Sequence, residues 1–247
     1  MTDFLRSNMS EWRSKRGRSR VENRDACGVH ISNEQILAAV VDAAEVGIRG
    51  VEYARHWVQQ ILGIACTNSA LTHEQLVSAM RQAHSEQQAA GYLSEIAAYA
   101  VLVIDLKGGV SWALNCGDCR IGCITKEEEL RWLTPVHTCA NPLGEDFTAD
   151  HAAMSSRHIL TRRLRVKRFD EPALTLLDQN SVRSWLLATD GYWIENMENL
   201  NGNADHEDDA SVLHLSSPGS DIQRPVDCAN FFIHDKTIDL SIDASHQ

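Results

Sequence analysis

The chain has 247 residues, of which 43% are hydrophobic and 23% are charged, and this balance is typical of a folded globular protein. No apolar stretch reaches the ~18–20 residues that a bilayer-spanning helix needs, and the N-terminus lacks the apolar segment of a secretory signal. The formal net charge of −11 disfavours general nucleic-acid binding. We therefore expect neither a membrane nor a nucleic acid among the partners.

The seven cysteines do not form a zinc-binding pattern. Cys116, Cys119 and Cys123 lie close together, but β-like residues separate them and no further His or Cys pair follows at zinc-finger spacing. We interpret the cysteines as free thiols, which are typical of a reducing compartment. The sequence therefore predicts a cytoplasmic location.

The N-terminal segment is basic. Six cationic residues fall within twelve positions: Arg13, Lys15, Arg16, Arg18, Arg20 and Arg24. Most of them fit a solvated arm, and we predict such an arm over residues 1–16, followed by one domain over residues 17–240. A second interpretation is that one or two of these side chains bind a phosphate or another anion.

Hydrophobic periodicity predicts the first elements. Two short β-like runs cover residues 28–32 and 36–42, and apolar residues at helical spacing predict a helix over 50–62. Thr72 and Gln75 have the spacing of a capping box, which predicts the start of a second helix.

The middle of the chain changes to the period of β-strands. Four short β-like runs separated by turn signals predict an antiparallel meander: residues 99–105, 110–115, 119–124 and 130–134. A polar excursion follows over 139–157. A strand over 184–189 then ends at Asp190 and precedes a helix, and β-like runs over 211–215 and 230–234 close the chain.

This order of elements predicts an α+β protein. Helical segments bracket a strand-rich middle, which favours two antiparallel sheets packed face to face with helices outside. Parallel βαβ alternation is absent from the pattern, which argues against a dinucleotide-binding fold of the Rossmann type.

Four aspartates share one local context, at the end of a β-like run or in the tight turn beside it: Asp42, Asp118, Asp190 and Asp208. Asp25 precedes the first run in a similar way. Carboxylates held at the rim of a sheet are the ligands that Mg²⁺ and Mn²⁺ prefer. The alternative for any single one is an ordinary turn residue, because Asp side chains often hydrogen-bond to nearby backbone.

The segments that carry these aspartates follow one another in the order of a known set of motifs. They are Gly17-Arg18-Ser19-Arg20-Val21-Glu22-Asn23-Arg24-Asp25-Ala26, Ala38-Ala39-Val40-Val41-Asp42, Ala113-Leu114-Asn115-Cys116-Gly117-Asp118-Cys119-Arg120, Leu133-Thr134-Pro135-Val136-His137, Leu186-Leu187-Ala188-Thr189-Asp190-Gly191 and Asp208-Asp209-Ala210-Ser211-Val212. Together they resemble the motifs of the metal-dependent type 2C (PPM family) serine/threonine protein phosphatases, over about residues 17–215. The chain is similar to a divergent member of that family.

The resemblance implies a four-layer α-β-β-α sandwich with a binuclear Mg²⁺ or Mn²⁺ centre at one edge. Asp42 would bridge the two ions, and Asp190 and Asp208 would complete the site. Ala43 would offer its backbone carbonyl, and Asp25 would act directly or through water. Asp118 corresponds to the ligand of a third, more weakly held ion.

The resemblance also implies the reaction. The ions would activate a water for hydrolysis of a phosphomonoester, and Arg20 would bind the substrate phosphate with its bidentate fork. The implied partners are a phosphorylated protein substrate and a cognate Ser/Thr kinase, within a signalling role. No Cys-x5-Arg motif supports a cysteine-phosphate mechanism.

The chain departs from the family pattern around Asp42. Ala43 and Val46 stand where glycines are usual, and glycine there permits unusual backbone angles. Ala44 stands where many eukaryotic members have a histidine that is a candidate general acid. Glu45 adds a carboxylate for which we expect a solvent-facing position, and Arg24 stands where an acidic residue is common. These changes leave an alternative, a pseudophosphatase that binds phosphoproteins and regulates without turnover.

Overall fold

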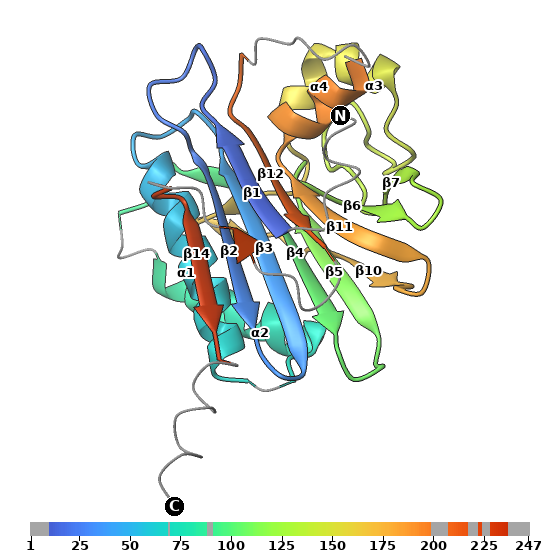
Figure 1. Ribbon diagram of the computed structural model, residues 1–247. Helices are drawn as coiled ribbons and strands as arrows, with labels where there is room; N and C mark the ends of the chain where they lie inside the picture. Colours follow the sequence, from blue (N-terminus) through green and yellow to red (C-terminus); the bar gives the residue numbers. More distant parts are fainter. Residues whose placement is uncertain are drawn as a thin grey trace, which may run out of the picture.

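The computed structural model describes residues 10–68, 70–87, 91–198, 207–216, 222–223 and 228–236. Two β-sheets pack face to face and helices lie on both outer faces, so the expected four-layer α-β-β-α sandwich is confirmed (Figure 1). Within the described part of the chain, no helix is long and apolar enough to span a bilayer.

One sheet has six strands in the order β13-β1-β12-β11-β6-β7. Their bounds are Ile222–Gln223, Ser10–Lys15, Ala210–Leu215, Val182–Ala188, Arg120–Thr125 and Leu130–Trp132. We call it the six-stranded sheet.

The other sheet has eight strands, six of them in the order β10-β5-β4-β3-β2-β14. Their bounds are Ala173–Leu177, Ser111–Cys116, Ile96–Asp105, Gln35–Ala43, Asp25–Ile31 and Phe231–Asp235. Two further strands, β8 (Leu164–Arg165) and β9 (Arg168–Phe169), form a small hairpin on β4. We call it the eight-stranded sheet.

Helices α1 (Gly50–Cys66) and α2 (His73–Glu86) cover the outer face of the eight-stranded sheet, and α2 begins at the predicted capping box of Thr72 and Gln75. On the outer face of the six-stranded sheet lie α4 (Asp190–Glu198) and α3 (Ala149–Ala153), with the short 3₁₀ helix η3 (Ser155–His158) beside α3. The polar excursion 139–157 therefore contains helical structure.

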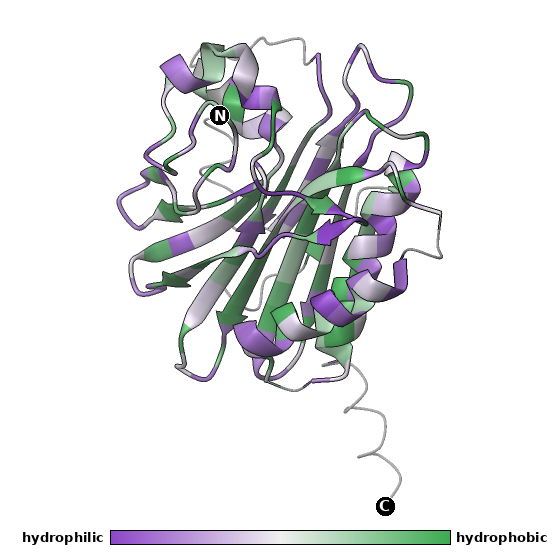
Figure 2. Cartoon of the chain, turned by 180° about the vertical axis from the view of Figure 1, so that it is seen from behind, coloured by the Kyte–Doolittle hydropathy of each residue, from purple (hydrophilic) through white to green (hydrophobic). Residues whose placement is uncertain are grey.

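Three apolar layers hold the sandwich together. The central layer lies between the sheets and joins residues such as Val40 and Leu102 of one sheet with Leu187 and Leu213 of the other. A second layer lies under α1 and α2, and a third lies under α4 around Trp193. Figure 2 shows that green, hydrophobic colour runs along the strands while purple concentrates on loops and outer helix surfaces. Because β3 contributes to apolar layers on both faces, its sequence is a continuous apolar run.

The strand pairing corrects the prediction of purely antiparallel sheets at two edges. β14 pairs with β2 in parallel, and β13 pairs with β1 in parallel. The predicted meander also divides: β4 pairs with β5, and β6 pairs with β7, but the chain crosses from one sheet to the other between β5 and β6. Local periodicity predicts strands but does not specify which sheet receives them.

The predicted solvated arm is corrected as well. Residues 10–15 form β1, an interior strand of the six-stranded sheet that pairs with β12, and Trp12 is buried between the sheets. Ser10, Trp12 and Ser14 alternate with charged residues, and this period of two outweighs the basic composition. Residues 1–9 and the expected limit at residue 240 lie outside the described residues.

Candidate functional site

The site begins at one end of the crevice between the sheets. Asp25 opens β2 and stands directly opposite Asp42 near the end of β3. Residues two and four positions from Asp42, Val40 and Ala38, belong to the apolar layer between the sheets, so Asp42 is on that same inner face. The alternation of β2 places Asp25 there too, since Cys27 belongs to the same layer.

The crossover between the sheets adds Asp118. Gly117 turns the chain with φ +97°, and a Cβ at this position would lie 2.5 Å from that of Ala98. Only glycine fits both requirements. Behind the turn, the Trp193 indole N–H donates a hydrogen bond of 2.8 Å to the Asp118 carbonyl, which fixes the backbone that presents this carboxylate.

The six-stranded sheet supplies Asp190 at the end of β11, as the first residue of α4. A Cβ on Gly191 would lie 2.2 Å from the carbonyl oxygen of Asp209, so glycine lets α4 approach the start of β12. Arg157, from η3, lies 3.7 Å from Asp190 Oδ2. The excursion between β7 and β8 therefore contributes a cation to the site.

Asp208 and Asp209 precede β12 and have different tasks. Asp209 is buried, and its two carboxylate oxygens accept hydrogen bonds from the backbone N–H groups of Gly17 and Arg24, at 2.9 and 2.8 Å. It thereby clamps the loop 17–24. Asp208 instead turns its carboxylate toward the guanidinium of Arg20.

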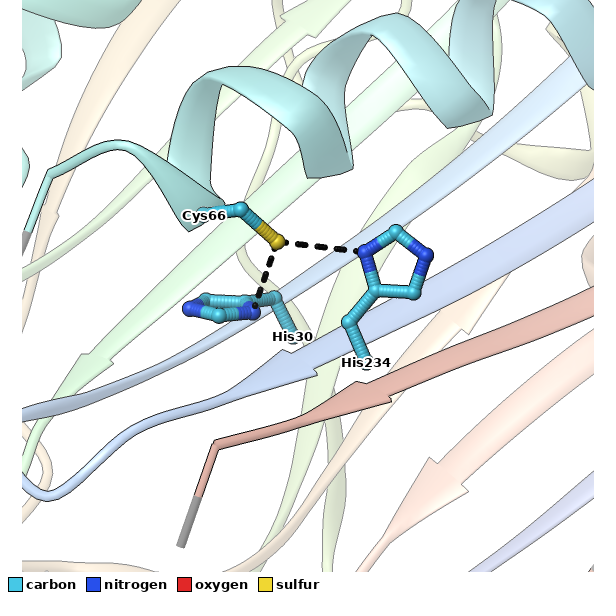
Figure 3. A group of neighbouring side chains, drawn as sticks. All are labelled: His30, Cys66 and His234. Carbon is cyan, nitrogen blue, oxygen red and sulfur yellow. Dashed lines mark hydrogen bonds between the residues drawn. The ribbon is translucent and has the colours of Figure 1, made fainter. Parts of the chain in front are cut away.

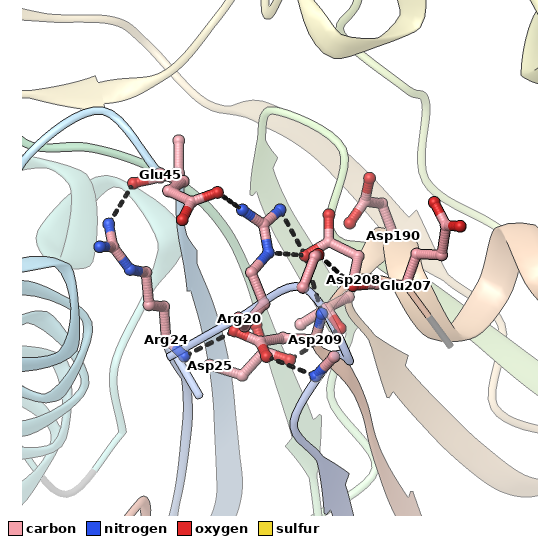
Figure 4. Close-up of polar contacts among 12 residues, drawn as sticks. Arg20, Arg24, Asp25, Glu45, Asp190, Glu207, Asp208 and Asp209 are labelled. Atoms are coloured by element: carbon pink, nitrogen blue, oxygen red, sulfur yellow. Dashed lines mark hydrogen bonds and ion pairs between the residues drawn. The ribbon is translucent and has the colours of Figure 1, made fainter. Parts of the chain in front are cut away.

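Arg20 lies between two carboxylates (Figure 4). Its Nε and Nη2 atoms are 2.8 and 2.6 Å from Asp208 Oδ1, and its Nη1 donates to Glu45 Oε2. Glu45 is half exposed, in keeping with the solvent-facing position expected, but it is also ion-paired. The fork predicted to bind a phosphate therefore binds a carboxylate of the chain itself.

The turn after β3 keeps ordinary backbone angles. Ala43 remains in the strand, where its N–H donates to the Arg24 carbonyl, and the Ala44 N–H donates to the carbonyl of Ile96. Among the described residues, Glu128 alone is a non-glycine residue with positive φ. The alanines in this turn consequently carry no left-handed strain.

Arg24 stabilises the same turn through hydrogen bonds. Its Nη1 donates to the carbonyls of Ala44 and Gly47, at 3.0 and 3.1 Å. The guanidinium thus binds backbone oxygens of the turn. Arg24 therefore stabilises the altered turn through its backbone carbonyls, at a position where the family commonly has an acidic residue.

The carboxylates perturb one another. Burial raises the pKa of Asp42, and the charges of Asp25, Asp190, Asp118 and Asp208 raise it further. Burial and Asp190 raise the pKa of Asp118. Burial and Asp208 raise the pKa of Asp190 to about 6, although Arg157 opposes the shift.

Asp25 is the most enclosed member of the group. Burial raises its pKa more than the hydrogen bonds of Ser211 and Thr189 lower it. Thr189 donates to Oδ2 at 3.1 Å, while Oδ1 is buried without a partner. An orphaned carboxylate oxygen beside other repelling carboxylates fits the donor set of a hard divalent cation.

These residues surround one cavity of about 250 Å³. It is lined by Arg20, Arg24, Asp42, Ala43, Ala44, Glu45, Val46, Ala98, Asp118, His158, Leu160, Asp190, Asp208 and Asp209. All the residues predicted for the site are in this lining except Asp25, which lies directly opposite Asp42 in the strand register.

Sequence reasoning missed three contributors: Glu45 as the partner of Arg20, Asp209 as a loop clamp and Arg157 beside Asp190. For Trp193 it favoured a core position over one near the site, and the buried indole has both. Trp193 follows Asp190 by three residues, and this helical spacing is a signal for a shared face. No local pattern indicates the other three, because each depends on how separate loops meet.

A four-layer sandwich with an acidic cavity at the end of its sheets is the architecture that the motif resemblance implied. The profile of the protein phosphatase 2C family matches residues 14–219. None of the curated protein sequences compared matches the chain. The chain belongs to the protein phosphatase 2C (PPM) family.

Solved structures of low sequence identity share the fold. A bacterial serine phosphatase has a TM-score of 0.68 at 16% identity, with 86% of this chain and 99% of that chain covered. The serine/threonine phosphatase Stp1 from Staphylococcus aureus has a TM-score of 0.69 at 16% identity, with 85% and 95% covered. The PPM Ser-Thr phosphatase MsPP from Mycobacterium smegmatis, in complex with cacodylate, has a TM-score of 0.60 at 20% identity, with 84% and 97% covered.

Proposed function

We propose that this protein is a metal-dependent phosphatase of phosphoserine and phosphothreonine in proteins. The observation that carries the proposal is the convergence of Asp42, Asp118, Asp190, Asp208 and Arg20 on one cavity. Asp25 adds a further carboxylate directly opposite Asp42 in the strand register. Family membership supports the same reaction class.

Two Mg²⁺ or Mn²⁺ ions would be held by Asp42, Asp190 and Asp208, with the Ala43 carbonyl and Asp25 as further oxygen donors and Asp118 beside a third ion. Such ions supply an activated water and neutralise phosphoryl charge. The mutual repulsion that raises the pKa values of these carboxylates is what bound cations would relieve.

Arg20 would orient the substrate phosphate through its fork. In the structure Glu45 and Asp208 share this guanidinium, so a substrate phosphate has to displace Glu45. Glu45 thus acts as an internal competitor for the anion site. Arg157 would hold Asp190 in place from the side of η3.

The substrate would be a phosphorylated protein, with a cognate Ser/Thr kinase supplying it. The seven cysteines are free in the structure, which is consistent with a cytoplasmic protein. A pseudophosphatase remains the competing outcome, because the anion site is ion-paired within the chain.

The test is hydrolysis of a phosphothreonine peptide with Mn²⁺, by the full chain and by Asp190→Ala. We expect Mn²⁺-dependent turnover that falls by about 10³-fold in the variant, which corresponds to about 4 kcal/mol of transition-state stabilisation. Asp178→Asn, in an exposed turn, is the matched control that should retain turnover.

Turnover that is absent, or that is unchanged by Asp190→Ala, contradicts the enzyme proposal. Phosphopeptide binding without turnover would favour the pseudophosphatase. Titration calorimetry with Mn²⁺ gives a separate readout: we expect two sites in the native chain and their loss in Asp42→Asn.

A further inference from the structure

A second group of metal-ligating side chains lies outside the acidic cavity. His30 on β2, His234 on β14 and Cys66 at the end of α1 point toward one another (Figure 3). Cys66 Sγ is 3.5 Å from His30 Nδ1 and 3.2 Å from His234 Nδ1. One potential ligand atom from each residue lies within 4.8 Å of the others.

Strand register brings the two histidines together. β14 pairs with β2 in parallel, and His234 stands directly opposite His30. Neighbouring positions in a register share a face of the sheet. The two imidazoles therefore lie side by side on the face that α1 covers.

Helix geometry brings Cys66 to the same place. Val58, Leu62 and Cys66 follow one another at intervals of four residues and form one stripe along α1. A Cβ on Gly28 would lie 2.6 Å from Val58 and 2.7 Å from Leu62, so this glycine lets the stripe rest on β2. One turn further along, the stripe ends with the thiol above His30.

The distances match a metal-binding geometry. A tetrahedral Zn²⁺ with ordinary Zn–S and Zn–N bonds separates its sulfur and nitrogen ligands by about 3.5 Å. Thiolate and imidazole together are the donors preferred by borderline-soft transition metals rather than by Mg²⁺. We propose that His30, Cys66 and His234 form a binding site for Zn²⁺ or a similar transition-metal ion, with water as the fourth ligand.

The surroundings support this assignment. The His30 side chain is only 3% exposed, which restricts its motion. Burial, with the charges of Lys236 and His234, lowers the pKa of His30 and favours the neutral imidazole that binds metals. The Lys236 ammonium donates to the Cys66 carbonyl, which ties the residue after β14 to the end of α1.

The site is separate from the phosphatase cavity. His30 lies five positions after Asp25 on β2, a span of roughly 17 Å. Asp25 faces the other sheet, whereas His30 faces α1. An ion here would fasten the edge strand β14 to α1 and β2.

Cobalt titration of the metal-free full chain tests the proposal. We expect a single equivalent of Co²⁺ to develop a thiolate-to-cobalt charge-transfer band with the intense d–d bands of tetrahedral cobalt, whatever further Co²⁺ the acidic cavity binds without that band. Cys66→Ser should abolish the charge-transfer band, and His234→Asn, which removes a direct ligand, should weaken Co²⁺ binding by more than the roughly 10- to 100-fold that loss of an outer-shell partner costs. Cys139→Ser, at an exposed cysteine, is the matched control and should retain the spectrum.

Further variants separate this site from the acidic cavity. Asp42→Asn should keep the charge-transfer band, and Cys66→Ser should keep Mn²⁺-dependent turnover. With the acidic cavity saturated by Mn²⁺, Zn²⁺ should raise the Tm of the native chain more than that of Cys66→Ser. A spectrum without the charge-transfer band, or one that survives Cys66→Ser, would overturn the proposal and leave a Cys–His hydrogen-bonded group without metal.

Discussion

The two sides of the acidic cavity differ in how closely they follow the family motifs. The retained side consists of the Gly117-Asp118 turn and the start of α4 at Asp190. The altered side consists of the turn 43–47 and the loop 17–24 that packs below it. On the retained side a glycine is required by both φ and space, whereas the altered side has no residue in the left-handed region.

This difference shows which substitution matters. Ala43 and Ala44 keep strand-like and ordinary turn geometry, and Arg24 braces the turn through backbone carbonyls. Loss of the family glycines therefore costs little backbone energy. Glu45 is the change with an electrostatic consequence at the anion site, because its carboxylate accepts from Nη1 of Arg20.

The largest effect should come from breaking the retained side. Gly117→Ala introduces a Cβ at positive φ and 2.5 Å from Ala98, and we expect it to lower the free energy of unfolding by about 3 kcal/mol. Denaturant titration measures this change. Gly108→Ala also lies at positive φ but has open space around it, so it should cost only about 1 kcal/mol. If both variants lost the same unfolding free energy, contact with Ala98 would not be the cause of the loss at Gly117.

A second test of the retained side uses pH. The His137 backbone N–H donates to the Gly117 carbonyl, and burial, with the charge of Arg162, lowers the pKa of its imidazole to about 4. The unfolded chain takes up this proton near pH 6.5. The stability from neutral His137 is therefore complete above that pH and is lost as the pH falls toward 4.

Between pH 7 and pH 5 this group should cost the native chain about 2 kcal/mol of unfolding free energy. The measurement is the difference in unfolding free energy between the native chain and His137→Gln at the two pH values. His151→Gln, on α3, controls for loss of a histidine elsewhere. A difference that does not change with pH would contradict the assigned burial effect.

The sequence predicted the fold and the positions of the aspartates along the chain, but not most of the side chains that contact the site residues. Each motif aspartate lies at a strand end or in a tight turn, so local periodicity was enough to place it. The Arg20–Glu45 pair joins a loop to a turn, and no local pattern specifies such a meeting. The run over 230–234 was predicted as a strand, but the parallel pairing of β14 was not, because its register depends on a strand about 200 residues earlier.

Removing the charge of Glu45 tests whether the altered side of the cavity weakens substrate binding at Arg20. Glu45→Gln removes the charged partner of Arg20 Nη1, and we expect KM for a phosphopeptide to fall about two- to fivefold, because half-exposed ion pairs are weak. Steady-state kinetics and inhibition by inorganic phosphate should shift together. Glu127→Gln, exposed in another turn, is the matched control. An unchanged or raised KM would mean that Glu45 does not compete with the substrate.

Restoring the family glycine should have the smallest effect on activity. Ala43→Gly removes a buried methyl group and loosens the strand end, so the free energy of unfolding should fall by about 1 kcal/mol. Turnover should change by less than about threefold, since the backbone is already in an ordinary conformation. Thermal unfolding and Mn²⁺-dependent kinetics measure the two quantities, with Ala44→Gly as the neighbouring control. If Ala43→Gly raised turnover tenfold or more, the alanine, rather than Glu45, would be what limits the altered side.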